Sequence, residues 1–167
     1  MHIDTDELEA CLAQYESIGA LLRARAHTSP DRVFFSWESH TITYEQIYCD
    51  ARRVGQTLTG LGLTKGDRVA IMMAPSPDWL TVWFGAALIG VVIVPINTAH
   101  LGEGLLHQLR DSQPSVLIID DDLVTRIEAI RAELSIDDVF VRGVVSAPSP
   151  AARAEASARG CDTCMDR

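Results

Sequence analysis

Acidic side chains gather where one predicted strand ends. Asp120, Asp121 and Asp122 follow directly after the apolar run Val116-Leu117-Ile118-Ile119, which is typical of a buried strand. Carboxylates at the carboxyl end of a parallel strand can hold a magnesium ion. They can equally form a solvated turn that caps the following helix, because negative charge is favoured at a helix start. No further strand follows residue 143 to carry partner groups, so we expect the solvated turn.

Cysteines and histidines are weaker candidates for redox or metal chemistry. Cys161 and Cys164 have the C-x-x-C spacing of a redox pair or half a zinc site, but they lie in a terminal stretch with no strand or helix start beside them. His100 and His107 are seven residues apart and lack a carboxylate or cysteine at ligand spacing. We expect exposed histidines and assign no role to the cysteine pair.

The sequence offers few residues for phosphate binding or for lysine chemistry. The sequence has neither G-x-x-x-x-G-K-[ST] nor G-x-G-x-x-G, the patterns whose amide groups wrap phosphate. Gly102-Glu103-Gly104 places a carboxylate where an anion would bind, so we interpret it as a flexible helix entrance. Lys65, the single lysine beside thirteen arginines, lies in a predicted turn. The sequence therefore predicts no catalytic, cofactor-binding or metal-binding residue.

Composition excludes several classes of protein. Among 167 residues, 14 are basic and 23 acidic, a net charge of -9, which disfavours nucleic acid and anionic lipid. The hydrophobic share of 47% is that of a packed chain. Four scattered cysteines and an acidic start without a secretory apolar core favour the cytoplasm.

The elements needed to position any site follow from apolar periodicity. Residues 5–28 predict a helix, 33–37 and 41–43 a hairpin, and Thr43 with Gln46 a capping box that opens a helix to about residue 61. Further predicted strands lie at 68–73, 91–94, 116–119 and 139–141, and predicted helices follow at 79–89, 101–113 and 123–134. Short continuous apolar strands alternating with helices indicate an α/β fold, a doubly wound and mostly parallel sheet with an N-terminal hairpin.

The uncharged run from Trp79 to Ile96 is long enough to span a bilayer. Gly90 interrupts it, the β-branched residues 91–94 follow, and Pro95 ends it. We therefore expect a helix and then a buried strand, and no membrane span.

Three blocks resemble the amino-terminal region of the adenylate-forming, AMP-binding superfamily. They are Ile42-Thr43-Tyr44-Glu45-Gln46-Ile47, the segment from Gly62 to Ile71, and the segment from Trp83 to Asn97, which ends in Pro-Ile-Asn. Their order and separation fit too. The third block looks most like the crotonobetaine/carnitine-CoA and fatty-acid-CoA ligase groups.

The resemblance implies a function for a complete relative. Such an enzyme uses ATP and magnesium to convert a carboxylic acid to an acyl-adenylate, and then transfers the acyl group to CoA. In the family, the phosphate loop, the nucleotide contacts, the magnesium-linked glutamate and the catalytic lysine lie downstream of these blocks. We therefore expect a truncated homologue, inactive alone, in which the matched blocks serve as scaffold.

The same resemblance suggests how the chain is divided. We expect a weakly ordered segment over 1–15, an incomplete AMP-binding large domain over 16–143, and a disordered tail over 144–167. The abrupt change in composition suggests a frame change near residues 143–147. The expected partners are a carboxylic acid in the complete enzyme, and a second copy or the missing C-terminal portion.

Two alternatives stay open. The first is a stand-alone α/β binding or interaction module that pairs with a separately encoded remainder. The second is a regulator related to phosphoacceptor receiver domains, because residues 115–122 resemble the first strand of such a domain.

Overall fold

The computed structural model describes residues 13, 15–136 and 138–142. Its helices are α2 (Ile18–Thr28), α3 (Tyr44–Gly60), α4 (Pro77–Ile89), α5 (Gly102–Ser112) and α6 (Val124–Glu128), with short 3-10 turns η1 (Asp121–Leu123) and η2 (Arg131–Glu133). Its strands are β1 (Val33–Trp37), β2 (His40–Thr43), β3 (Arg68–Met72), β4 (Val92–Pro95), β5 (Val116–Asp120) and β6 (Asp138–Arg142).

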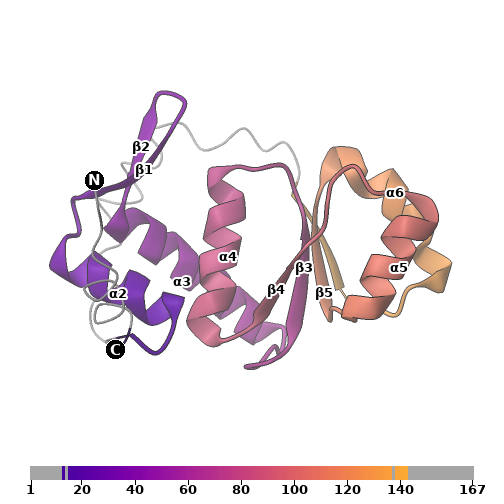
Figure 1. Cartoon of the computed structure of the whole chain (residues 1–167), viewed down its shortest axis with the longest axis horizontal. Helices are drawn as coiled ribbons and strands as arrows, with labels where there is room; N and C mark the ends of the chain where they lie inside the picture. Colours follow the sequence, from indigo (N-terminus) through magenta and orange to yellow (C-terminus); the bar gives the residue numbers. More distant parts are fainter. Residues whose placement is uncertain (1–12, 14, 137, 143–167) are drawn as a thin grey trace.

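The strands form two separate sheets. β1 and β2 pair as an antiparallel hairpin, and the other four strands form a parallel sheet in the order β4-β3-β5-β6. Helices α3 and α4 lie on one face of the parallel sheet and α5 and α6 on the other, with α2 beyond α3 and α4 (Figure 1). The predicted α/β class and the N-terminal hairpin are confirmed.

Three buried clusters hold these layers together. One lies between the sheet and α5 and α6, one between the sheet and the helices α3 and α4, and one among α2, α3, α4 and the hairpin. Residues of β3 alternate between the two sheet faces, as period-two side chains must, so Val69 and Ile71 belong to the α4 side and Ala70 and Met72 to the α5 side. The sheet is therefore covered on both faces at β3, which explains its uninterrupted apolar sequence.

Glycines bring the helical layer into close contact. A Cβ added at Gly85 of α4 would lie 2.6 Å from Cβ of Val54 and 2.8 Å from the carbonyl oxygen of Ala51, both in α3. One added at Gly55 of α3 would lie 3.1 Å from the carbonyl oxygen of Gly85. The two helices thus pack with their backbones nearly touching, which only glycine permits at this crossing.

Local capping chemistry sets the helix starts. Thr43 Oγ1 accepts from the Gln46 amide at 3.3 Å, and the Gln46 side chain accepts from the Thr43 amide at 2.9 Å, which confirms the predicted capping box. Ser76 caps α4 by accepting from the Trp79 amide at 3.2 Å, and Pro77 follows at the first helical position. Both helices that pack through the glycines are therefore fixed at their amino ends.

The apolar run from Trp79 to Ile96 is divided as the sequence predicts. Gly90 ends α4 with φ of +75°, a left-handed conformation that glycine adopts without strain, and β4 follows. Over the described residues, we find no helix with the length and hydropathy needed to cross a bilayer.

Two predicted helices are wrong in extent. Instead of one helix over 123–134, the chain forms η1, α6 and η2, because it leaves helical geometry at Ile130, whose φ is −120°. This break lets Ile130 and then Ile136 reach the same cluster as Ile127. The first predicted helix, over 5–28, is interrupted at residues 15–17, since Ser17 is an extended N-cap and α2 begins at Ile18; Ala13 is helical, and the other residues of 5–14 lie outside the described part of the chain.

Candidate functional site at the carboxyl ends of the strands

The carboxyl ends of β3 and β5 mark the point where the chain changes direction across the sheet. After β3 the chain crosses to β4 on one side, and after β5 it crosses to β6 on the other. In open parallel sheets, ligands usually bind outside the strand ends at such a switch point. The residues at this place are therefore the first candidates for a functional site.

Asp120 lies at this switch point and is buried. The residue is 6% exposed, and its Oδ2 accepts from the Ala74 amide at 2.8 Å, just beyond β3. Its Oδ1 accepts from Arg142 Nε at 2.6 Å, at the end of β6. The carboxylate thus joins the ends of three parallel strands.

This burial corrects the expectation of a solvated, helix-capping turn. Asp121 and Asp122 are exposed as predicted, but Asp120 makes no side-chain capping bond to the turn that follows it. The parallel register places Asp120 directly beside Arg142, whose positive charge compensates the buried carboxylate. Sequence spacing could not reveal this pairing, because the two residues are 22 positions apart.

Arg142 extends the network to the start of α4. Its Nη1 donates to Ser76 Oγ at 2.9 Å and lies 3.2 Å from Asp78 Oδ2. Ser76 Oγ therefore accepts from both Arg142 and the Trp79 amide. Sequence reasoning did not single out Arg142; its position, directly after the apolar residues of β6, was the only available signal.

The chemistry of this network is that of a structural ion cluster. One guanidinium satisfies Asp120 and contacts Asp78, and the second Asp120 oxygen is occupied by a backbone amide. Among residues 13, 15–136 and 138–142, no group of three or more His, Cys, Asp or Glu side chains could hold a metal ion. The described residues therefore do not fit a magnesium site.

Lys65 lies at the opposite end of the sheet, before β3 begins. The turn that contains it is held by Asp67, whose Oδ2 accepts from the Thr64 amide at 2.6 Å and from the Thr64 hydroxyl at 2.9 Å. These hydrogen bonds, the backbone one first, lower the pKa of Asp67 below its usual range. Lys65 is exposed as predicted, and its aliphatic stem lies over Gly90.

The other sequence candidates remain apart. His107 is exposed as predicted, but His100 is half-buried, with Nδ1 2.8 Å from Gln108 Oε1. Gly102 opens α5 with φ of +53°, a left-handed conformation that glycine adopts without strain. Cys161 and Cys164 lie outside the described residues.

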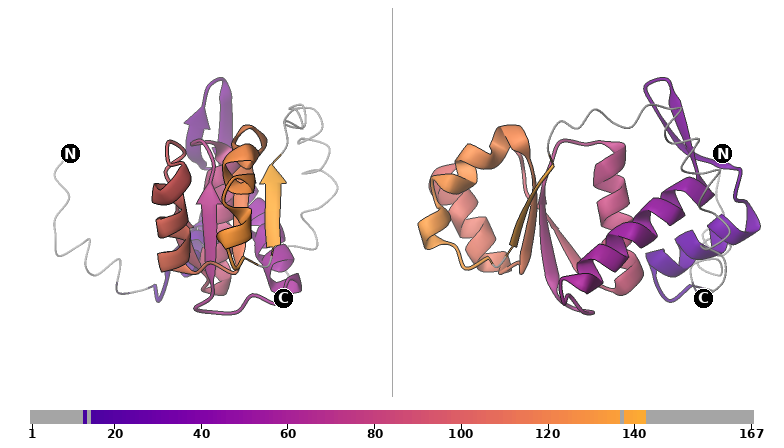
Figure 2. Two further views of the ribbon diagram at one scale, coloured as in Figure 1. Left: turned by 90° about the vertical axis from the view of Figure 1, so that its right-hand side faces the viewer. Right: turned by 180° about the vertical axis from the view of Figure 1, so that it is seen from behind.

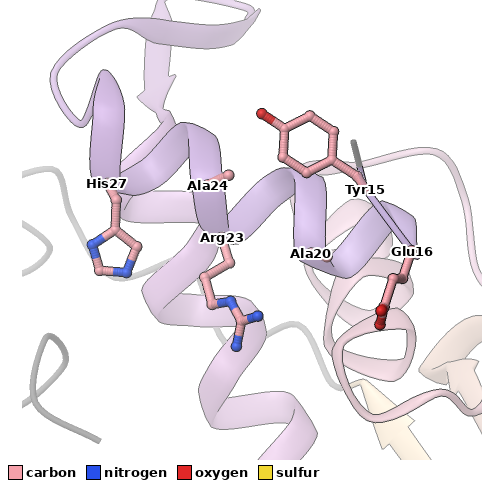
Figure 3. A pocket seen from close by; sticks show the side chains of 6 residues that line it. All are labelled: Tyr15, Glu16, Ala20, Arg23, Ala24 and His27. Atoms are coloured by element: carbon pink, nitrogen blue, oxygen red, sulfur yellow. The ribbon is translucent and has the colours of Figure 1, made fainter. Parts of the chain in front are cut away.

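A hollow of about 460 Å³ lies along α2, away from the strand ends. It is lined by four residues of α2 and by two residues that precede its N-cap, namely Tyr15, Glu16, Ala20, Arg23, Ala24 and His27. Figure 3 shows its charged side chains spread along the helix instead of converging on one point. Because a small-molecule site needs convergent polar groups and an apolar wall, this hollow does not have the character of one.

Comparison with known proteins shows the family of this chain. The model of the AMP-binding enzyme family matches residues 22–162. The chain belongs to the AMP-binding enzyme family. It is similar to a long-chain-fatty-acid–CoA ligase of Mycobacterium tuberculosis, with 38% identity over 120 residues, and to a crotonobetaine/carnitine–CoA ligase of Salmonella paratyphi B, with 34% identity over 93 residues. These matches cover 71% and 56% of this chain, but only 24% and 18% of the relatives.

Solved structures of AMP-binding proteins share the fold. The anthranilate CoA ligase AuaEII in complex with anthranoyl-AMP superposes with a TM-score of 0.72 and 27% identity, covering 80% of this chain and 26% of that one. The N-terminal domain of FACL13 from M. tuberculosis superposes with a TM-score of 0.71 and 36% identity, covering 75% and 34%. The chain thus spans about a quarter to a third of these proteins.

Proposed function

We propose that residues 22–142 supply the N-terminal scaffold of an acyl-CoA ligase and none of its reacting groups. The complete enzyme would convert a carboxylic acid, ATP and CoA to acyl-CoA, AMP and pyrophosphate. The observation that supports this most is the combination of a family match over most of the chain with an ion cluster, Asp120 to Arg142, at the switch point of the sheet. Groups engaged with one another are poorly placed to stabilise a transferring phosphate.

We further propose a fatty acid as the substrate class. The relative with 38% identity is a long-chain-fatty-acid–CoA ligase, and a Bacillus subtilis protein of the same name is 29% identical over 129 residues. Magnesium, ATP and CoA would bind groups outside the described residues. The 167-residue chain is accordingly proposed to be inactive alone.

A chimera tests the scaffold role. Residues 22–142 would replace the matched 120-residue stretch of the M. tuberculosis ligase, and acyl-CoA formation from a long-chain fatty acid would be measured. We expect activity within about tenfold of the parent ligase. A matched chimera that carries Gly85→Leu should lose activity through misfolding, because even a Cβ at this position meets the backbone of α3. A chimera that folds cooperatively but forms no acyl-adenylate would contradict the scaffold role.

A second candidate is an interaction module that folds alone and pairs with a separately encoded remainder. The three buried clusters favour independent folding. Thermal unfolding followed by circular dichroism and by tryptophan fluorescence tests it. Coincident, cooperative transitions support the module, whereas a broad, non-cooperative loss of signal supports a fragment that depends on the rest of its domain.

A further inference from the structure

The exposed edge of β6 differs from the other edge of the parallel sheet. β6 is the terminal strand next to β5, and within the described residues it pairs with no other strand. Figure 2 shows it at the outer side of the sheet. The opposite edge strand, β4, ends in Pro95, and proline on an edge discourages further strand pairing. β6 contains neither proline nor lysine, so its edge lacks these protections.

The apolar side chains of β6 lie on both faces of the strand, and two of the three remain exposed. Phe140 is 39% exposed and Val141 is 49% exposed. The register with β5 pairs Phe140 with Ile118, a residue of the cluster on the α4 side, while Val139 packs with the cluster on the α5 side. A strand that pairs with this edge would therefore gain apolar contacts on both faces of the sheet.

The sequence of β6, Asp-Val-Phe-Val-Arg, is complementary to itself when reversed. In an antiparallel pair of two copies centred on Phe140, Asp138 lies opposite Arg142 and Val139 opposite Val141. Phe140 then meets its own symmetry mate on the two-fold axis. Directly opposed ionic, aromatic and β-branched residues are the pairs that stabilise antiparallel strands.

We propose that β6 is a homodimerisation strand, which joins two copies of this chain into a continuous eight-stranded sheet across a two-fold axis. The alternation of side chains selects this register, because a shift by one residue turns the apolar side chains to the wrong faces and places either Asp138 opposite Val141 or Arg142 opposite Val139. An isologous contact of this kind closes after two copies. The inference does not depend on the activity proposed above.

Sedimentation velocity of the 167-residue chain from about 5 to 200 μM tests this association, because a five-residue strand gives a concentration-dependent dimer and not a permanent one. We expect Asp138→Lys, which places like charges opposite Arg142 twice per dimer, to raise the dissociation constant at least about tenfold. Asp31→Lys makes the same charge change on an exposed loop residue and should leave the dissociation constant unchanged. A chain that stays monomeric, or one that responds equally to both variants, overturns the proposal.

Disulfide trapping locates the contact. In a background with all four native cysteines replaced by serine, Phe140→Cys should cross-link two chains, because opposed residues of an antiparallel pair lie within disulfide reach. Val92→Cys, 49% exposed on the other sheet edge, is the matched control and should not cross-link above background.

Dimers without trapping at residue 140 would mean a different interface. Monomers whose β6 amides resist hydrogen exchange at every concentration would mean that the chain's own residues cover the edge, and both results reject the proposal.

Discussion

At the scale of single residues, the Asp120–Arg142 pair is the feature with the largest consequence. It joins the loop after β3, the ends of β5 and β6, and the N-cap of α4 through four contacts of one guanidinium and one carboxylate. A buried carboxylate is tolerated only when it is paired and hydrogen-bonded. The strand ends where doubly wound proteins usually bind ligands are therefore fixed here by an internal ion pair.

Asp120→Asn should destabilise the chain by about 1 to 3 kcal/mol, because it leaves the part-buried Arg142 without its closest anion. Urea unfolding measures this free energy. Asp122→Asn, at an exposed neighbour, should change it by no more than about 0.5 kcal/mol. Equal changes in the free energy of unfolding for the two variants would contradict the role of Asp120 in joining the strand ends.

Asp67 gives a prediction about pH. Its pKa is lowered first by the Thr64 amide and then by the Thr64 hydroxyl, so its contribution to stability is present above the usual carboxyl range and is lost as pH falls through the lowered pKa. Thr64→Val removes the hydroxyl donor and should raise the pKa of Asp67 toward its usual value, as followed by NMR titration of its carboxyl carbon. Asp31 in the same spectra serves as an internal control. An unchanged pKa of Asp67 in the variant would show that the hydroxyl plays no part.

At the scale of elements, the α3–α4 crossing decides how the helical layer meets the sheet. Gly85 is the residue of closest approach, and its environment contrasts with that of Gly104 in α5, where an added Cβ meets nothing within 4 Å. Because both glycines are helical, substitutions at Gly85 and Gly104 change helix propensity alike, and only the substitution at Gly85 also changes packing.

Gly85→Ala should lower the free energy of unfolding by about 1 to 3 kcal/mol, because the overpacking at α3 exceeds the gain in helix propensity. Gly104→Ala should raise it by up to about 1 kcal/mol, since only propensity changes there. Chemical denaturation of both variants measures the difference. Stabilisation by Gly85→Ala would show that the two helices are not in close contact.

The sequence predicted elements with strong local signals. The capping box at Thr43, the Gly90 and Pro95 punctuation and the short apolar strands all depend on neighbouring residues, and each appears where expected. The prediction of one helix over 123–134 was wrong because tertiary packing, and not local periodicity, sets the position of Ile130, which packs in the cluster on the α5 side of the sheet. The prediction of a solvated Asp120 was wrong for a similar reason. The pairing of β5 with β6 places Arg142 beside Asp120, and no local sequence pattern marks Arg142.

At the scale of the whole molecule, the described part of the chain consists of helices layered on a parallel sheet. Its sheet is covered by helices on both faces, and its matches extend over most of this chain but over about a quarter of its relatives. These two facts together favour a scaffold whose chemistry is supplied elsewhere. The lone Lys65, held in a turn at the far end of β3, agrees with that interpretation.

The most direct test of this account is pyrophosphate exchange by the 167-residue chain alone. Purified protein is incubated with ATP, magnesium, labelled pyrophosphate and fatty acids of increasing chain length, beside a full-length long-chain ligase as positive control. The account predicts no acid-dependent incorporation of label into ATP above the blank. Acid-dependent exchange that follows the chain through purification would contradict it, because the chain would then form an acyl-adenylate by itself.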